Sequence, residues 1–523
     1  MMKKIILSMV LLAYSLGSGA QEMAHGIIFE DMNGNGKKDR KEKGIDGVAV
    51  SNGLQVVQSD TKGKYELPVG EDQIIFVIKP SDYQVPLDEH NLPQYFYIHK
   101  PNGSPQLDFE GVEATGKLLK SIDFALVPGE SKENFTSLVF GDPQPYTIEE
   151  VNFFADGVVS EVEGIEGIDF GLSLGDLVGD DLSLFHPYIR VIAKVGIPWY
   201  NVLGNHDLNY DGEKDEFADE SFEANFGPAN YAFNHGKVHF IVLDDILYPD
   251  PRDAKGYWGG FREDQLEFVK NTLAFVPKDH LIVLSMHIPL SEPDERDLFR
   301  DEDRERLFEL LDDYPHTLSL SAHTHLQKQD FFYEKDGWKQ QNPHHHYNVG
   351  TTSGDWYKGT LNEKGIPIST MRDGTPKGYA FIDFDGNQYN IRYKVVDRDE
   401  DYQMEIFAPK VLKKDQGTSA GIYVNFFIGE SDNELKVRID NGEWVKMSFV
   451  KDYDPTYLVD LYQWDITEEL LNGRRPSNPQ KSTHLWRANI PTNLDAGNHV
   501  IEVEATDIFG NQHRATKPYR LIE

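Results

Sequence analysis

The stretch IPWYNVLGNHD, residues 197–207, places an apolar run directly before the polar turn Gly-Asn-His-Asp. A short apolar run that ends at a turn is typical of a buried strand. Four further stretches have the same form: SLVFGDPQ (137–144), DFGLSLGD (169–176), HLIVLSMH (280–287) and TLSLSAHTH (317–325). Helical patterns such as TIEEVNFFADGVVSEVEG (147–164) and REDQLEFVKNTLAFV (262–276) lie between them. This alternation predicts a layered α/β domain.

Each of the five runs ends in side chains that can bind a metal ion. They are Asp142 with Gln144, Asp176, Asn205 with His206 and Asp207, His287, and His323 with His325. In an open α/β sheet, ligands bind at the carboxyl ends of the strands, so these side chains are expected to converge. Taken singly, an aspartate after glycine can cap a helix and a lone histidine can be a packed or solvated side chain. The repetition over five runs favours a metal site.

The order G-D-x-Q, G-D, G-N-H-D, H and A-H-x-H, over residues 137–396, resembles that of the calcineurin-like metallophosphoesterases. The resemblance implies a four-layer α/β/β/α domain that hydrolyses phosphate mono- or diesters. It also implies two divalent metal ions, Mn, Fe, Zn or Mg, that share Asp176 as a bridging ligand. One ion would take Asp142, Gln144 and His325, and the other would take Asn205, His287 and His323.

The resemblance also implies a mechanism. Two ions in such a site bind phosphoryl oxygens and lower the pKa of a water, so that a metal-activated hydroxide attacks phosphorus in line. By the same resemblance, His206 protonates the departing oxygen as general acid and Asp207 orients its ring. The expected substrate is a small-molecule, lipid or sugar phosphate ester, and the sequence leaves its identity open.

Two positions depart from the pattern of the family, because Gln144 stands where it usually has histidine and Ala322 where it usually has glycine. An amide oxygen is a harder and weaker donor than imidazole, so Gln144 is expected to shift preference from Zn²⁺ toward Mn²⁺, Mg²⁺ or iron. The alternative is a degraded site. A purple acid phosphatase would have a tyrosine three residues after Asp176, where this chain has Gly179. No tyrosine-to-iron charge-transfer colour is therefore expected.

The ends of the chain read differently from its centre. Residues 1–20 have two lysines, an apolar run and small residues ending at Ala20, the pattern of a cleavable secretory signal. Short β-rich runs with Gly, Pro and Asn turns then predict a sandwich over residues 21–130 and a second one over 401–523. The phosphoesterase domain would occupy residues 131–400. The mature protein is expected in the periplasm or secreted, with no transmembrane segment.

The composition limits both partners and metal ligands. There are 51 Lys plus Arg against 87 Asp plus Glu, a net charge of −36, which repels a nucleic-acid backbone. Nucleic acid is therefore not an expected partner. The 523 residues contain no cysteine, so every metal ligand must be nitrogen or oxygen.

Three weaker signals lie outside the five runs. Residues 31–42 fit the calcium-loop pattern D-x-[DN]-x-[DN]-G-x5-E with oxygens at Asp31, Asn33, Asn35, Asp39 and Glu42. Their flanks read as strands, and a structural Ca²⁺ is weighed against a solvated polar turn. The run His344-His345-His346 is expected to be a solvated loop rather than part of the site. The loops 350–359 and 371–379 could form a substrate wall or be ordinary turns.

Two rival functions stay open. A non-catalytic surface or carbohydrate-binding protein that retains the scaffold would bind ligand without metal and hydrolyse nothing. A metal-dependent hydrolase of another ester class would not act on generic phosphate esters. Because all seven predicted ligand positions hold coordinating atoms, the sequence favours a phosphoesterase.

Overall fold

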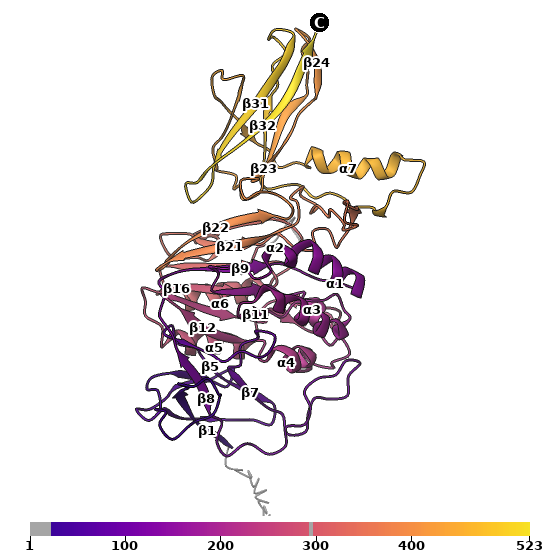
Figure 1. The fold of residues 1–523 in the computed structure, drawn as a ribbon. Coiled ribbons are helices and arrows are strands. Elements are labelled where there is room, and N and C mark those ends of the chain that lie inside the picture. Colours follow the sequence, from indigo (N-terminus) through magenta and orange to yellow (C-terminus); the bar gives the residue numbers. More distant parts are fainter. Residues whose placement is uncertain (1–21, 292–296) are drawn as a thin grey trace, which may run out of the picture.

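The computed structural model describes residues 22–291 and 297–523, so the predicted signal segment 1–20 lies outside the described residues. Figure 1 shows three parts along the chain: N-terminal sheets in indigo, a central α/β part, and C-terminal sheets in orange and yellow. The predicted mixed α/β class with sheet-rich regions at both ends is confirmed. In the described ranges, no helix has the length and apolar character needed to cross a membrane.

The N-terminal part consists of two four-stranded sheets. One has the order β4 (Lys64–Pro68), β1 (Met23–Glu30), β8 (Phe124–Pro128) and β6 (Tyr83–Gln84). The other has the order β3 (Val56–Gln58), β2 (Ala49–Ser51), β5 (Gln73–Val77) and β7 (Phe96–His99). Alternating apolar residues such as Ile28 and Leu67 are buried between them, because side chains on a strand point to opposite faces.

The central part has two mixed sheets whose inner strands are parallel. The five-stranded sheet runs β11 (Trp199–Asn201), β10 (Phe170–Ser173), β9 (Asn134–Phe140), β21 (Gly378–Asp385) and β22 (Gln388–Val395). The six-stranded sheet runs β12 (Tyr231–His235), β13 (Val238–Val242), β16 (Leu281–Ser285), β17 (Thr317–Ser321), β19 (His344–Asn348) and β18 (Lys328–Phe332). Strands β9 to β11 pair in parallel, as do β13, β16, β17 and β19. These strands are buried along their length, as expected for parallel strands covered on both faces.

Helices connect these strands, as the sequence predicted. They are α1 (Ile148–Phe154) with its continuation α2 (Ser160–Val162), α3 (Phe185–Ile192), α4 (Glu220–Phe226), α5 (Glu263–Leu273) and α6 (Asp301–Leu310). Helix α1 contacts α3, and α5 contacts α6, so the helices form two separate pairs. Helix α4 was not predicted. The central domain therefore has the four-layer α/β/β/α architecture.

The hydrophobic core does not stop at the predicted boundary near residue 130. One continuous cluster of buried residues contains Phe76 of β5 and Phe268 of α5, whose ring centroids are 5.8 Å apart. Tyr95 and Tyr231 meet in the same way, with centroids 5.4 Å apart. Because the first sandwich and the central domain share this core, we expect them to unfold together.

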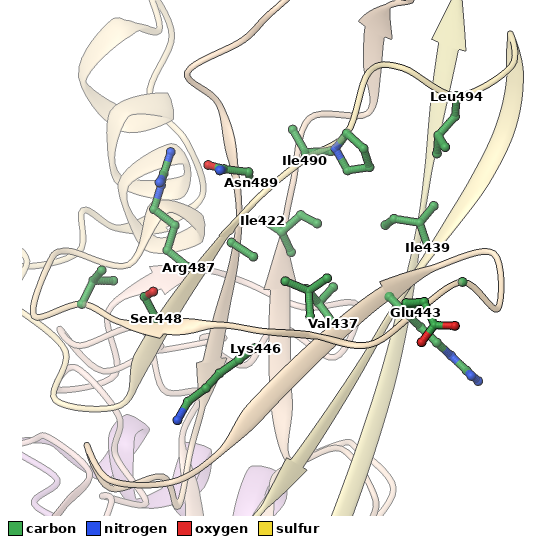
Figure 2. Close-up of a pocket in the computed structure, with 16 residues that line it drawn as sticks. Ile422, Val437, Ile439, Glu443, Lys446, Ser448, Arg487, Asn489, Ile490 and Leu494 are labelled. Carbon is green, nitrogen blue, oxygen red and sulfur yellow. The ribbon is translucent and has the colours of Figure 1, made fainter.

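The C-terminal part also packs two sheets on a separate core. One runs β23 (Met404–Phe407), β25 (Gly421–Phe426), β30 (Leu485–Asn489) and β28 (Ser448–Phe449). The other runs β24 (Val411–Lys413), β32 (Gln512–Ile522), β31 (Gly497–Thr506), β26 (Leu435–Ile439) and β27 (Val445–Lys446). A cavity of about 570 Å³ opens between them, with Ile422, Val437 and Ile490 in its lining (Figure 2). Helix α7 (Pro455–Ile466) was not predicted and projects from this part in Figure 1.

Two short strands tie this C-terminal part to the central domain. Strand β20 (Gly359–Thr360) pairs with β29 (Gly473–Arg474), and Arg474 donates to Glu150 of α1 at 2.6 Å. The pairing with β29 therefore holds the end of the loop that precedes β20, and Arg474 links the same C-terminal segment to α1. The loop before β20 also lies next to the predicted metal ligands, as described below.

Candidate metal centre

The seven predicted metal ligands lie on loops that follow the carboxyl ends of parallel strands in both central sheets. Asp142 follows β9, Asp176 follows β10, Asn205 follows β11, His287 follows β16, and His323 and His325 follow β17, with Gln144 two residues beyond Asp142. The two sheet edges meet, since Asp176 Oδ1 lies 3.2 Å from His287 Nε2. The structure thus brings together residues that are up to 183 positions apart, from Asp142 to His325.

The loops that carry these side chains have an unusual backbone. Five of the ligand positions have a left-handed φ: Asp142 (36°), Gln144 (39°), Asp176 (49°), His323 (63°) and His325 (52°). For a residue with a Cβ this conformation costs on the order of 1–3 kcal/mol and persists only where the surroundings impose it. Such strain concentrates at functional sites, which supports a functional role for the loops.

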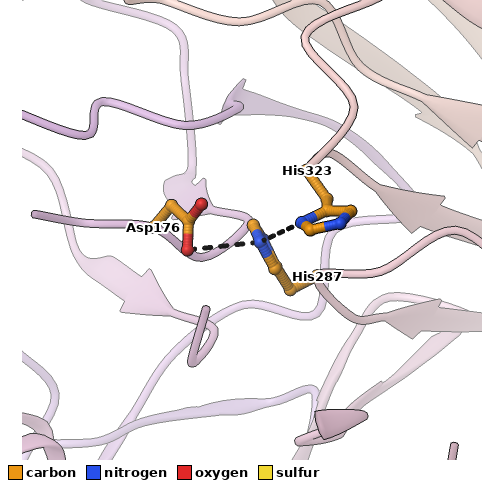
Figure 3. Close-up of side chains that lie close together, drawn as sticks. All are labelled: Asp176, His287 and His323. Atoms are coloured by element: carbon orange, nitrogen blue, oxygen red, sulfur yellow. Dashed lines mark hydrogen bonds and ion pairs between the residues drawn. The ribbon is translucent and has the colours of Figure 1, made fainter. Parts of the chain in front are cut away.

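One set of donors, the His287 group, comprises Asp176, Asn205, His287 and His323. His287 Nε2 lies 3.1 Å from Asn205 Oδ1 and 3.1 Å from His323 Nδ1, and Figure 3 shows the His323 ring and the Asp176 carboxylate on either side of His287. The ligand atoms of Asp176, His287 and His323 all lie within 4.8 Å of one another. Apart from His323, which is half-buried, these side chains are buried.

The other set, the Gln144 group, comprises Asp142, Gln144 and His325. His325 Nε2 lies 2.8 Å from Gln144 Oε1 and 3.8 Å from Asp142 Oδ1. The amide nitrogen of Gln144 points to Asp176 Oδ2 at 3.0 Å, so its oxygen is the atom offered to the group. Asp142 Oδ1 is buried and has no hydrogen-bond partner among the described residues. A buried carboxylate oxygen without a partner costs about 1–3 kcal/mol or more, and a cation would remove this cost.

The histidine tautomers suit metal binding. His287 Nδ1 lies 2.8 Å from the carbonyl oxygen of Leu174, and His325 Nδ1 lies 2.6 Å from that of Gly354. A carbonyl oxygen can only accept, so Nδ1 carries a proton in both rings, and in the neutral form of each ring the Nε2 lone pair faces the donor set. Carbonyl partners of this kind orient ligating histidines in metal sites. The residues present therefore fit divalent ions.

The electrostatics of the centre call for positive charge. Burial opposes a charged imidazole, yet Asp176 raises the pKa of His287 to about 10. Burial, together with repulsion from Asp176, raises the pKa of Asp142 well above its usual range. Burial lowers the pKa of His325 to about 3, so this ring is neutral. A divalent ion would neutralise the carboxylates and let the imidazoles bind in their neutral form, as ligation requires.

Comparison with known proteins covers most of the chain. Residues 135–327 match the family "Calcineurin-like phosphoesterase". Residues 32–114 and 346–513 match the "N terminal" and the "C terminal of Calcineurin-like phosphoesterase". The chain belongs to the calcineurin-like phosphoesterase family. The match to residues 135–327 confirms the resemblance seen in the sequence.

Individual relatives of this calcineurin-like phosphoesterase are distant. Colossin-A of Dictyostelium discoideum is 29% identical over 171 residues, which are 32% of this chain and 1% of that protein. The purple acid phosphatase PPD1 from yellow lupin (Lupinus luteus) seeds is 14% identical with a TM-score of 0.37, covering 71% of this chain and 66% of that one. The spore cortex lytic enzyme SleM of Clostridium perfringens is 12% identical with a TM-score of 0.20, covering 75% and 99%.

In this calcineurin-like phosphoesterase, the predicted acid His206 lies in a short turn of 3-10 helix, Asn205–Asp207. Its side chain is 25% exposed, and its Nδ1 lies 2.6 Å from Asp180 Oδ1. Burial opposes protonation, but Asp176 and Asp180 raise the pKa of His206 to about 9. The His206 ring is therefore protonated on both nitrogens at neutral pH, and Asp180 accepts a hydrogen bond from Nδ1.

The predicted contact between Asp207 and the His206 ring is not the one that the structure shows. The Asp207 carboxylate accepts the backbone N–H groups of Leu177 and Val178, both at 3.1 Å, and of Gly204 at 2.8 Å. The tight turn at residues 205–207 directs this side chain back toward the loop of Asp176. Asp207 thus holds the loop of Asp176 and the loop of Asn205 together. The carboxylate that contacts the His206 ring is that of Asp180.

Tyr146 lies beside Gly179, the position at which a tyrosine was expected for a purple acid phosphatase. A Cβ on Gly179 would lie 2.7 Å from the ring of Tyr146, so Tyr146 fills the room beside that position. Its hydroxyl lies 3.4 Å from Gln144 Nε2, and its ring lies 5.7 Å from that of His206. Burial raises the pKa of Tyr146, so the phenol stays neutral.

One residue beside the predicted ligands, Asp245, was not predicted from the sequence. Asp245 is buried, and its carboxylate accepts the backbone N–H of His287 at 3.2 Å and that of Ile288 at 3.0 Å. The acidic pair that ends FIVLDD, residues 240–245, was the available signal. Trp356, in the loop 350–359 that the sequence offers as a substrate wall or an ordinary turn, stacks on His325 with ring centroids 4.0 Å apart.

The histidine run is not a solvated loop, contrary to the prediction. His344, His345 and His346 belong to the buried strand β19. His344 contacts Thr317 and Ser319 at 2.8 Å, and His346 contacts Ser319 at 2.6 Å and Ser321 at 2.8 Å. Hydroxyl groups on the neighbouring strand β17 thus satisfy the rings of His344 and His346, as buried polar groups require, and His345 Nδ1 contacts the Tyr389 hydroxyl at 2.8 Å.

The loop of residues 31–42 folds around its first aspartate. Asp31 Oδ1 accepts the N–H of Gly34 at 2.7 Å, and Oδ2 accepts that of Gly36 at 2.7 Å. The amide groups of Asn33 and Asn35 donate to Asp39 Oδ2 at 2.8 and 3.1 Å. Glu42 Oε1 and Oε2 accept the N–H groups of Met32 and Asp39 at 3.1 and 2.7 Å. The five side chains predicted to offer oxygen therefore lie together within one short loop.

Proposed function

We propose that the protein is an exported phosphoesterase that hydrolyses phosphate mono- or diesters with two divalent ions held at the carboxyl edges of its central sheets. The observation that supports this proposal best is the convergence of the His287 group and the Gln144 group on Asp176. Asp176 Oδ1 lies 3.2 Å from His287 Nε2, and Oδ2 lies 3.0 Å from the Gln144 amide. A carboxylate placed between two donor sets is suited to bridge two ions.

The residues of the centre divide the work. Asp142, Gln144 and His325 would hold one ion, and Asn205, His287 and His323 the other, with Asp176 shared. Ions of this kind bind phosphoryl oxygens and make water a stronger nucleophile at neutral pH. Leu174 and Gly354 hold the two histidine rings by their carbonyl groups, and Asp207 and Asp245 hold the ligand loops by backbone N–H groups.

His206 would act as the general acid. Its Nδ1 is engaged by Asp180, which leaves Nε2 to donate a proton to the departing oxygen. The raised pKa of His206, about 9, keeps that proton on the ring at neutral pH. Asp180 is in this account a positioning residue, because it acts through the imidazole.

The remaining parts of the proposal come from the sequence. The leader of residues 1–20 would direct export, with cleavage near Ala20, and the mature protein would be periplasmic or secreted. The substrate would be a small-molecule, lipid or sugar phosphate ester, and the net charge of −36 disfavours nucleic acid. Residues 31–42 would hold one structural Ca²⁺ through the oxygens of Asp31, Asn33, Asn35, Asp39 and Glu42.

The test is a screen of phosphomonoesters against phosphodiesters with the full chain after reconstitution by Mn²⁺, Zn²⁺, Mg²⁺ or iron. We expect metal-dependent phosphate release that chelation abolishes and metal restores. A matched His287→Ala variant controls for contaminating phosphatase. Ligand binding without hydrolysis under every metal would instead favour the non-catalytic binding protein, and hydrolysis of other esters alone would favour a different hydrolase.

A further inference from the structure

Two cations lie close to the aromatic ring that stacks on His325 of the Gln144 group. The Trp356 ring stacks on His325 at 4.0 Å between centroids, with an interplanar angle of 25°. Lys358 Nζ lies 4.9 Å from the centre of the Trp356 ring, and the guanidinium carbon of Arg372 lies 5.2 Å from it. All three side chains are half-buried. Both cations therefore lie against a ring that contacts a predicted metal ligand, in a chain whose net charge is −36.

The backbone that presents Trp356 is held against its own preference. Trp356 and Tyr357 have left-handed φ values of 51° and 53°, which for bulky residues are uncommon. Arg474 donates to the carbonyl oxygen of Trp356 at 2.6 Å, and the Tyr357 hydroxyl donates to the carbonyl oxygen of Pro143. The C-terminal part of the chain thus fixes the ring over the centre.

The cations are anchored by separate elements. Arg372 Nη2 donates at 2.7 Å to the carbonyl oxygen of Thr324, the residue between His323 and His325. Lys358 Nζ donates at 2.7 Å to Ser477 Oγ in the segment after β29. A cation held in place and partly withdrawn from water attracts an anion more strongly than a mobile surface cation, because less solvent screens it.

We propose that Lys358, Arg372 and the Trp356 ring form a subsite for a second anionic group of the substrate, so that the phosphate ester carries one anion besides the phosphoryl group at the metal centre. The inference rests on the proposed function and narrows its substrate class. Arginine and lysine both bind carboxylate and phosphate groups, and arginine can do so with two parallel hydrogen bonds. The simpler alternative is that both cations only steady Trp356 through cation–π contact.

The test compares two phosphonates that cannot be hydrolysed. 3-Phosphonopropionate carries a carboxylate where propylphosphonate carries a methyl group. Their dissociation constants are measured by titration calorimetry with the Mn²⁺-reconstituted full chain. We expect 3-phosphonopropionate to bind about tenfold more tightly or better, as one charge-assisted contact allows. In the double variant Lys358→Gln/Arg372→Gln the ratio of the two constants should fall to about one.

Two matched variants separate a subsite from a steadying role. Lys358→Arg/Arg372→Lys keeps both charges and should keep the ratio. Arg475→Gln removes a charge from the same segment, where Arg475 pairs with Asp465 at 2.6 Å, and should also keep it. Equal loss of affinity for both phosphonates in the Gln variant, or a wild-type ratio near one, overturns the subsite.

The outcomes also separate this inference from the proposed function. Phosphate-ester hydrolysis without discrimination between the two phosphonates would leave the function standing and overturn the subsite. A charge-dependent ratio in a protein that hydrolyses no phosphate ester would support the anion subsite and overturn the catalytic proposal.

Discussion

The His287 group and the Gln144 group occupy the same sheet edges but differ in their donors. Besides the shared Asp176, the His287 group has two imidazoles and the amide oxygen of Asn205. The Gln144 group has one imidazole, the carboxylate of Asp142 and the amide oxygen of Gln144. Both stand on loops with left-handed residues, so the scaffold is equivalent on the two sides. The His287 group therefore offers two nitrogen donors and the Gln144 group one, and the two should differ in metal preference.

Removing a ligand of the His287 group should have the largest effect. We expect His287→Ala to lower kcat/KM by about 10³-fold or more, because a bound metal contributes several kcal/mol of charge stabilisation. Metal content by mass spectrometry should fall by at least one ion per chain. His186→Ala, at an exposed position on α3, is the matched control. Unchanged metal content would remove His287 from the centre.

Removing the acid should cost less and spare both groups. We expect His206→Ala to lower kcat by about 10²–10⁴-fold while both ions stay bound, because its role is to donate a proton. Substrates whose leaving group has a low pKa need less protonation and should lose less. Equal losses for good and poor leaving groups, with intact metal content, would contradict this role.

Exchanging Gln144 tests the comparison directly. Gln144→His should raise Zn²⁺ affinity by about tenfold or more and move the metal optimum away from Mn²⁺, since imidazole is the better donor to Zn²⁺. Gln144→Ala should lose the ion of its own group during dialysis before that of the His287 group. The readouts are metal content after dialysis and activity across a metal series. If stoichiometry and preference stay the same in both variants, Gln144 is not a ligand.

The smallest effect is expected far from both groups. If residues 31–42 hold Ca²⁺, saturating calcium stabilises the folded chain by about 2–3 kcal/mol, which corresponds to a rise of a few degrees in Tm. Asp31→Ala should abolish that rise without changing kcat. Because the first sandwich shares its core with the central domain, the shift should appear in their common transition. A wild-type melting curve that ignores calcium would rule out the ion.

Sequence reasoning worked best where the local pattern carries the information. The central strands and helices α1, α3, α5 and α6 follow from apolar runs and helical periodicity, and the candidate ligands from their place after each run. It failed at His344 to His346, because three polar rings next to a proline look like a loop until their partners are known, which are hydroxyl groups of β17 for His344 and His346 and Tyr389 for His345. It missed α7, in which the apolar residues Val459, Tyr462 and Ile466 are exposed.

The sequence by itself determined the family and the order of the central elements, and it named the seven candidate ligands, because motif spacing is a property of the chain alone. Only the tertiary structure decided which atoms face the centre. Asp180 rather than Asp207 contacts His206, carbonyl groups select the tautomers of His287 and His325, and Trp356 covers His325. These contacts join loops separated by tens to hundreds of residues, and their geometry depends on how two sheets and the C-terminal part pack together.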